Sequence, residues 1–336
     1  MRRAANLFDQ IVTCDNLRTA FLKAARGKQS LSAVREFAAN LDGRIAEISQ
    51  QLQTDQFPLG RFHQFVIRDP KERVITAPCF DERVLHHAIM NVCEPVFDRW
   101  LIDDTFACRQ GKGREAAVGS AAGFAHRHIW FLKCDIRKYF DSISHVQLRG
   151  LLQRRLKDRR LLSLLDRIIG SFRGEIGRGL PIGSLTSQHL ANFYLGWFDR
   201  FVKETLQVRG YVRYMDDMIL WDNDSCSLKT IEVKCREFLG DVLSLDLNPV
   251  TLQRTSAGVN FLGCRIWPTH VGLSRRSKRR WRRRVRDLER AARLGLITER
   301  ELQIRMEAAT AFVRGADVKS WRFRQAALQN VVVDGQ

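Results

Sequence analysis

The chain has 336 residues, of which 45% are hydrophobic, and this content predicts a folded protein with a substantial core rather than a disordered chain. Its formal net charge is +19, which makes nucleic acids and other polyanions the expected partners. No uninterrupted apolar run reaches the roughly eighteen residues of a membrane-spanning helix, and residues 1–10 lack a secretory signal, so we expect a cytoplasmic protein with no membrane partner.

The first sixty residues are predicted to be helical, because their apolar residues recur at helical spacing. The repeating positions are Leu17, Phe21, Leu22, Val34, Phe37, Leu41 and Ile45. A further helix is expected around residues 81–88, where His86 and His87 are adjacent. We expect these two histidines to be structural or to contact RNA rather than to bind a metal, because no cluster of partner ligands follows them.

The apolar stretch at 128–134 predicts a buried strand that ends at Asp135. A polar break and a helical pattern from Ser144 to Leu156 follow, so the carboxylate of Asp135 should be accessible at the strand tip. Residues 179–188 are rich in turn formers, and their glycines allow a ligand to approach the backbone closely. They open a helix whose apolar face is formed by Leu190, Phe193, Tyr194, Trp197, Phe198 and Phe201.

Asp216 and Asp217 are adjacent carboxylates inside the apolar run 211–221, where a turn between two strands is expected. Magnesium is usually held by one or two carboxylates together with substrate phosphates and water, so such a pair suits metal binding. With Asp135 as the third carboxylate, the site could hold two Mg²⁺ ions about 4 Å apart, as in two-metal nucleotidyl transfer. An ordinary Asp-Asp turn is the alternative interpretation, since Asp is common in turns.

A basic segment at 275–284 has Lys or Arg at eight of its ten positions, with Trp281 among them. Pro268 and Gly272 are expected to interrupt regular secondary structure just before this segment. The segment is either a solvated surface or a helix that grips a nucleic acid backbone, with binding that weakens steeply as salt rises. We expect phosphate contacts from Arg275, Arg276, Lys278, Arg279 and Arg280.

The order of Asp135 at a strand end, a glycine-rich loop with its helix, and a Tyr214-Met215-Asp216-Asp217 hairpin resembles the palm of reverse transcriptases. Residues 71–76, 81–88 and 106–113 look like the fingers of bacterial enzymes of this class, and 260–263 looks like their primer-grip hairpin. The resemblance implies an α+β, right-hand polymerase fold. It divides the chain into N-terminal helices and fingers at 1–125, a palm of antiparallel sheet plus helices at 126–267, and a basic helical thumb at 268–336.

The resemblance also implies an RNA-directed DNA polymerase that uses two Mg²⁺ ions, for which Mn²⁺ can substitute, and that binds template RNA, a cDNA or primer strand, and dNTPs. Asp135, Asp216 and Asp217 would be catalytic and, with Ile136, would bind metal. The nucleotide would be contacted by Lys71, Arg73, Lys138, Tyr139, Phe140, Ile182, Gly183 and Gln188. The primer or template would also meet Tyr214, Met215, Phe261, Leu262 and Gly263. Phe140 corresponds to the aromatic residue that excludes a 2′-hydroxyl.

The segment 182–188 departs from the Gln-Gly-x-x-x-Ser-Pro form of most relatives and resembles the form found in diversity-generating retroelements. That subfamily implies mutagenic retrohoming with adenine-directed errors, assisted by a small basic helical accessory protein. Ile182 replaces an amide side chain, and we expect this loss of a polar contact to contribute to the errors. The alternatives are another bacterial reverse transcriptase, of retron, intron or phage-defence type, an RNA-binding palm protein without catalysis, or a structural RNA-packaging factor whose basic helix is its whole function.

Two further expectations concern residue types. The eight cysteines include no close C-x-x-C pair, which favours reduced thiols over a zinc ribbon or a disulfide framework. The loop at 245–253 offers no lysine, although many relatives place there the lysine that protonates pyrophosphate, so the general acid is unassigned.

Overall fold

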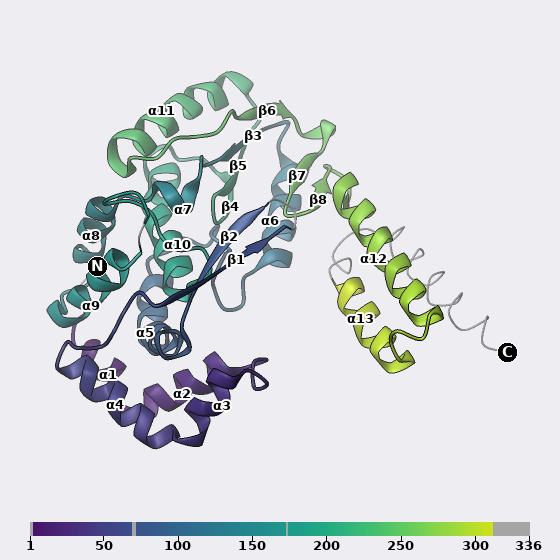
Figure 1. The fold of residues 1–336 in the computed structure, drawn as a ribbon. Coiled ribbons are helices and arrows are strands. Elements are labelled where there is room, and N and C mark those ends of the chain that lie inside the picture. Colours follow the sequence, from purple (N-terminus) through teal and green to yellow (C-terminus); the bar gives the residue numbers. More distant parts are fainter. Residues whose placement is uncertain (1–2, 69–71, 173, 312–336) are drawn as a thin grey trace.

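The computed structural model describes residues 3–68, 72–172 and 174–311 (Figure 1). The chain begins with four helices, which confirms the helical prediction for this region: α1 (Phe8–Ile11), α2 (Cys14–Ala25), α3 (Ser32–Ala39) and α4 (Leu41–Gln53). Thr13 caps α2, since its side chain accepts a hydrogen bond from the amide of Asn16. Of the predicted apolar positions, Leu22 is an exception, because its side chain is 68% exposed.

A two-stranded antiparallel hairpin and two helices follow. The hairpin pairs β1 (Phe62–Ile67) with β2 (Arg73–Pro78). The long helix α5 (Phe80–Asp98) packs against α2 and α10, and α6 (Arg114–Arg127) lies against the sheets that come later in the chain. Because α5 contacts both the N-terminal helices and α10, it joins the N-terminal region to the rest of the molecule (Figure 1).

The central sheet has four strands in the order β4-β5-β3-β6, and all neighbours are antiparallel. Its strands are β3 (Trp130–Asp135), β4 (Gly210–Tyr214), β5 (Asp217–Asp222) and β6 (Thr251–Arg254). The associated helices are α7 (Tyr139–Ser142), α8 (His145–Gln153), α9 (Arg159–Gly170), α10 (Leu185–Arg200) with the π-helical η1 (Phe201–Thr205), and α11 (Ser225–Leu243).

Strands β3, β4 and β5 of the central sheet are largely buried, which is why they appear as mostly apolar runs in the sequence, whereas the edge strand β6 is largely exposed. Along β5, Met218 and Leu220 belong to the large core with α10 and α11. Ile219 and Trp221 belong to a second core with α6 and with buried residues between 259 and 266. This alternation follows from the two-residue period of a strand.

A three-stranded antiparallel sheet follows a short 3₁₀ helix, η2 (Thr255–Ala257), and consists of β7 (Val259–Phe261), β8 (Cys264–Ile266) and β9 (Val271–Leu273). The segment at 268–272, in which an interruption before the basic helix was expected, connects β8 to β9 and begins β9, and the basic helix starts at Arg275.

The chain continues with α12 (Arg275–Arg293) and α13 (Glu299–Ala311), which pack against each other beside the small sheet (Figure 1). Their contact has its own small apolar cluster, centred on Val285, Leu302 and Met306. All eight cysteines are free. Across the residues that the structure describes, every helix is too short or too polar to cross a membrane. The fold therefore combines helices with antiparallel sheets, as the sequence predicted.

Candidate active site

The acidic pair lies at the turn of the hairpin formed by β4 and β5. Tyr214 pairs with Asp217, so that only Met215 and Asp216 form the turn. Met215 has a φ of +55°, which is unfavourable for a residue with a side chain and is tolerated where surrounding contacts impose it. The expected hairpin is confirmed, and its tight turn presents Asp216 and Asp217 at one edge of the central sheet.

Asp135 ends β3 directly opposite Asp217, because these two residues are partners in the β3–β5 register. Side chains of directly opposed residues in an antiparallel pair lie on the same face of the sheet. Asn248 holds Asp135 through two bonds, since its side-chain Nδ2 donates to Oδ2 of Asp135 at 2.8 Å and its backbone amide donates to the carbonyl oxygen of Asp135 at 2.8 Å. Ile136, expected beside the metal, is buried and forms an isolated bridge with Leu247.

The carboxylates of this site are crowded and poorly solvated. Burial raises the pKa of Asp217 to about 6, with smaller contributions from Asp135 and Asp216, while Lys133 opposes the shift. Burial, followed by the charge of Asp135, also raises the pKa of Asp216, and Arg73 and Arg213 act in the opposite direction. Bound cations would stabilise the charged forms of these groups.

The donor set fits a hard divalent cation. The side-chain oxygens of Asp135, Asp216 and Asp217 are the type that Mg²⁺ and Mn²⁺ prefer, and the carboxylate of Asp217 is ion-paired with Lys133, whose Nζ lies 3.0 Å from Oδ1. Within the described residues, no three or more His, Cys, Asp or Glu side chains are arranged so that they could hold a metal ion by themselves. Substrate phosphates and water would therefore have to complete the coordination, as is usual for Mg²⁺.

A buried ionic network supports the turn from behind. The guanidinium of Arg213 is fully buried and uses all five of its N–H donors. Two go to the carboxylate of Asp199, at 2.6 Å each, and two go to Asn192. The fifth goes to the carbonyl oxygen of Met215 at 3.1 Å. Arg213 thus connects the strained turn to α10.

The same network continues through neighbouring hydroxyls and an amide. Tyr211 and Thr105 each donate to Asp199, at 2.7 and 2.6 Å. Asn192 donates to the carbonyl oxygen of Ala107. Every charged group in this cluster is paired, which is the condition under which buried charges are tolerated.

The glycine-rich loop lies against the β1–β2 hairpin. The amide of Thr76 donates to the carbonyl oxygen of Ile182 at 2.7 Å, and the side chain of Ile182 is half-buried. Gly183 has a φ of +121°, and a Cβ there would lie 2.7 Å from the Cγ2 of Ile75 and 3.1 Å from the carbonyl oxygen of Thr76. Gly183 therefore allows the close approach of loop and hairpin, while Gln188 is exposed on α10.

The same loop is supported from α5. Ser184 is buried, and its hydroxyl hydrogen-bonds with Nδ1 of His86 at 3.0 Å and with the hydroxyl of Thr186 at 2.9 Å. Burial lowers the pKa of His86 to about 3, so the ring is neutral at physiological pH. His86 is thus a structural residue, in line with the interpretation that placed it outside a metal site.

The residues after Asp135 form a compact turn. Lys138 is exposed and left-handed, with a φ of +46°, and precedes the short helix α7. Tyr139 is buried and donates its hydroxyl hydrogen bond to the carbonyl oxygen of Ala191 on α10. Phe140 is half-buried and packs edge-on against Tyr139, with ring centroids 5.7 Å apart. Of these three residues, only Lys138 and Phe140 have side chains that solvent can reach.

A second hairpin shares a cavity with Asp217. Phe261 pairs with Cys264, and the two turn residues Leu262 and Gly263 both have positive φ, +47° and +80°. Nε of Arg114 donates to the carbonyl oxygen of Leu262 at 2.9 Å. A cavity of about 690 Å³ brings this turn, Asp217 and the start of α12 together. Its lining includes Arg73, Lys133, Asp217, Asn260, Phe261, Leu262, Gly263, Arg275, Arg276 and Arg280.

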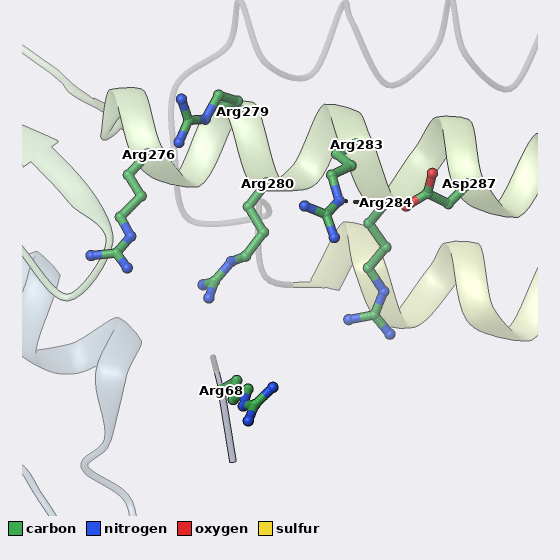
Figure 2. Close-up of a pocket in the computed structure, with 7 residues that line it drawn as sticks. All are labelled: Arg68, Arg276, Arg279, Arg280, Arg283, Arg284 and Asp287. Carbon is green, nitrogen blue, oxygen red and sulfur yellow. Dashed lines mark ion pairs between the residues drawn. The ribbon is translucent and has the colours of Figure 1, made fainter. Parts of the chain in front are cut away.

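The basic segment forms the first half of α12, and its arginines line a second cavity of about 450 Å³. Figure 2 shows Arg280 and Arg284 extending from α12 toward Arg68, which comes from the end of the β1–β2 hairpin. The other lining residues are Arg276, Arg279, Arg283 and Asp287, and Arg283 forms an ion pair with Asp287 at 3.7 Å. This concentration of arginines suits a phosphate backbone.

The structure brings together many of the residues that the sequence predicted for the site, but the prediction missed several others. Lys71 lies outside the described residues, and Lys278 is exposed on α12 without lining either cavity described here. Tyr214 and Met215 form the end of β4 and the first turn position. The residues not anticipated are Lys133, Arg213 and Asn248. For Lys133 and Arg213 a signal existed, because each is a single charge inside an apolar strand.

A family model described as "Reverse transcriptase (RNA-dependent DNA polymerase)" matches residues 68–266. The group II intron-encoded protein LtrA of Lactococcus lactis subsp. cremoris is 26% identical over 168 residues, which cover 47% of this chain and 28% of LtrA. Protein YkfC of Escherichia coli is 23% identical over 279 residues, which cover 67% of this chain and 73% of YkfC.

The match thus spans less than a third of LtrA, so it includes only part of that relative. Among solved structures, apo telomerase from Candida tropicalis, truncated from its C-terminal domain, has a TM-score of 0.48 and 12% identity. That similarity covers 69% of this chain and 60% of the telomerase chain.

Proposed function

Since the chain belongs to the reverse transcriptase family, we propose that it is an RNA-directed DNA polymerase that extends a primer on a template RNA by two-metal nucleotidyl transfer. The observation that carries this proposal is the meeting of three aspartates at one sheet edge, beside a cavity that leads to an arginine-lined helix. We also propose that helices α1–α6 and strands β1 and β2 form the N-terminal region and the fingers. The central sheet and the small three-stranded sheet would form the palm. The thumb then begins at Arg275.

Each group near the aspartates has a task in this proposal. When bound, two Mg²⁺ ions would supply an activated primer 3′-hydroxyl and charge neutralisation for the leaving pyrophosphate. Asp135, Asp216 and Asp217 would hold them, and Asn248 keeps the Asp135 carboxylate in one orientation. Arg73, whose charge already acts on Asp216, is suited to meet the triphosphate.

The polymerase proposal is tested by measuring Mg²⁺-dependent dNTP incorporation on a primed RNA template. Asp216→Asn removes one charged ligand and should reduce incorporation by at least about a hundredfold, because charge stabilisation carries most of this reaction. Asp241→Asn on the exposed part of α11 is the matched control and should leave incorporation unchanged. A loss of incorporation with both variants, or with neither, would contradict the assignment of the site.

For the biological role we propose mutagenic retrohoming in a diversity-generating retroelement, assisted by a small basic helical protein. Support comes from the resemblance of residues 182–188 to that subfamily and from the half-buried Ile182, whose side chain offers no hydrogen bond to a nucleotide. Sequencing of cDNA made with template RNA and the accessory protein tests this role. Errors concentrated opposite template adenines support it, whereas accurate copying contradicts it. Ile182→Gln should lower the adenine-directed error frequency.

A second candidate is an intron-type reverse transcriptase. It is favoured by the names of relatives such as LtrA, which is described as a group II intron-encoded protein. Accurate cDNA synthesis with preference for a structured intron RNA would support this candidate. Tight, salt-sensitive RNA binding without incorporation under any condition would instead support a non-catalytic palm protein.

A further inference from the structure

Lys133 is the residue of the central sheet whose position is least explained by folding alone. It lies in the middle of β3, between strands β5 and β6, where most side chains are apolar and buried. Lysine is rarely found in such a place unless its ammonium group has partners. Its side chain is 25% exposed, so the charge lies at the wall of the 690 Å³ cavity rather than in open solvent.

The ammonium group of Lys133 contacts one catalytic carboxylate from the side. Its Nζ lies 3.0 Å from Oδ1 and 3.1 Å from Oδ2 of Asp217. The placement follows from the strand period, since Lys133 and Asp135 are two residues apart and share a face, and Asp135 is opposite Asp217. Lys133 therefore supplies a positive charge to the group of carboxylates that the metal site requires.

The same ammonium group also contacts the second hairpin. Nζ of Lys133 donates to the carbonyl oxygen of Asn260 on β7 at 2.6 Å. This contact joins two different sheets, because β3 belongs to the four-stranded sheet and β7 to the three-stranded one. The side chain of Lys133 thus fixes the position of Asp217 relative to the hairpin of Leu262 and Gly263.

Two consequences follow from elementary electrostatics. A divalent cation that binds Asp217 must compete with an ammonium group that already occupies its carboxylate, and the fixed positive charge also repels the cation. Removal of the charge should therefore tighten cation binding. It should also release the hairpin, because the carbonyl oxygen of Asn260 loses its donor.

We propose that Lys133 is a positioning residue that sets the divalent-cation affinity of the aspartate site and couples this site to the hairpin that contacts the primer. The proposal rests on the proposed function, since it assumes a metal site at Asp217. In this role Lys133 weakens metal binding to the free protein but aligns the primer end with the metals once the substrate is present.

The first test measures Mn²⁺ binding to the full-length protein by electron paramagnetic resonance, without nucleic acid. Lys133→Met should bind Mn²⁺ roughly tenfold more tightly than wild type, because a unit charge has been removed from a few ångströms away. Lys133→Arg keeps the charge and should stay close to wild type. Lys157→Met, at an exposed site between α8 and α9, is the matched charge-removal control and should have no effect. Circular dichroism would verify that each variant is folded.

The second test measures primer extension with wild type and the same variants. Lys133→Met should raise the KM for template–primer by about fivefold or more and lower kcat, even though it binds the metal more tightly. If Lys133 had a purely structural role, its replacement would not raise both the affinity for Mn²⁺ and the KM for template–primer. Equal Mn²⁺ affinity for wild type and Lys133→Met would overturn the inference.

The outcome for Asp217→Asn separates the two proposals. If this variant loses Mn²⁺ binding while Lys133→Met matches wild type, the metal site stands and the role of Lys133 is rejected. If wild type binds no Mn²⁺, or if Asp217→Asn binds it as well as wild type, the proposed metal site fails, and the inference fails with it.

Discussion

At the residue scale, Arg213 shows how the strained turn of Met215 and Asp216 is held. Its fully buried guanidinium donates hydrogen bonds to the carboxylate of Asp199 and to the carbonyl oxygens of Met215 and Asn192. Such a network can be stable only as a whole, because loss of one partner leaves a buried charge unpaired.

Arg213→Met should therefore lower the free energy of unfolding by about 3–5 kcal/mol, the usual cost of breaking a buried ion pair from one side. Urea unfolding monitored by circular dichroism measures the change. Tyr211→Phe removes only one hydrogen bond to Asp199 and should cost about 1 kcal/mol. Adding Asp199→Asn to Arg213→Met should recover part of the loss. A wild-type unfolding curve for Arg213→Met would contradict this account of the turn.

Phe140 makes a second residue-scale prediction. It is half-buried at the end of the turn that follows Asp135, where a bulky ring would meet the sugar of an incoming nucleotide. Phe140→Ala should reduce discrimination against ribonucleotides by roughly tenfold or more, because one steric contact of this size is worth that factor. The ratio of kcat/KM for dNTP and rNTP is the measurement. Phe238→Ala on α11, which disturbs a stacked pair with Phe201, should leave the ratio unchanged.

At the element scale, α12 concentrates arginines on a helix that faces the β1–β2 hairpin (Figure 2). Each phosphate contact should add about 0.9 to the slope of log affinity against log salt for duplex DNA. The triple variant Arg279→Gln, Arg280→Gln and Arg284→Gln should lower that slope by up to about 3 units. Fluorescence anisotropy with a labelled duplex over a salt series measures it.

A matched variant decides whether the effect belongs to α12. Arg26, Arg35 and Arg159 are exposed on other parts of the chain, and their replacement by Gln removes the same net charge. This control should change the slope much less. Equal slopes for the two triple variants would mean that the whole positive field, rather than α12, attracts the nucleic acid.

The elements themselves were largely predictable from sequence, and the exceptions have a common cause. The strand ending at Asp135, the Asp216-Asp217 hairpin and the helix after residue 184 all leave strong local patterns of period 2 or 3.6. Strand β9 does not, because its three residues are stabilised mainly by pairing with β8. Lys133 is marked in the sequence as a charge inside an apolar strand, but neither it nor Asn248 could be assigned a partner, since Asp217 and Asp135 are more than eighty residues away from them in the chain.

At the scale of the whole molecule, α12 and α13 form a unit with its own small core. Val285, Leu302 and Met306 pack together separately from the main cores. Regions with so few buried contacts open at lower free energy than the rest of a protein. Met306→Ala should destabilise this unit by about 1–3 kcal/mol. Hydrogen exchange should then accelerate in α12 and α13 but not in β3 and β5, whereas Leu220→Ala should accelerate exchange in the central sheet.

Acid stability is a second property of the whole molecule. Burial lowers the pKa of His87 to about 4 and that of His189 to about 4, with nearby positive charge adding to the effect at His87. In the unfolded chain these histidines take up protons near pH 6.5. Their contribution to stability is therefore fully present above pH 6.5 and is lost as the pH falls toward 4.

The combined variant His87→Gln and His189→Gln should flatten the dependence of unfolding free energy on pH between 6.5 and 4. The loss of slope is at most about 1.4 kcal/mol per pH unit for each histidine. His126→Gln, at an exposed site on α6, should retain the wild-type slope. Unfolding free energies from urea titrations at four pH values would check this, and parallel curves for all three proteins would exclude the assignment.

Ser274 connects the start of α12 to the hairpin of Leu262 and Gly263. Its amide donates to the carbonyl oxygen of Gly263 at 3.0 Å, and its hydroxyl caps α12 by accepting from the amide of Ser277 at 3.2 Å. The helix α12 is thus anchored at its start to the turn of Leu262 and Gly263. With 19 residues it is about 28 Å long, so a tilt of about 10° moves its far end by about 5 Å. Its base hardly shifts, and the arginines up to Arg284 lie in its first half, so they would move by only about 3 Å or less and would keep their place beside the turn.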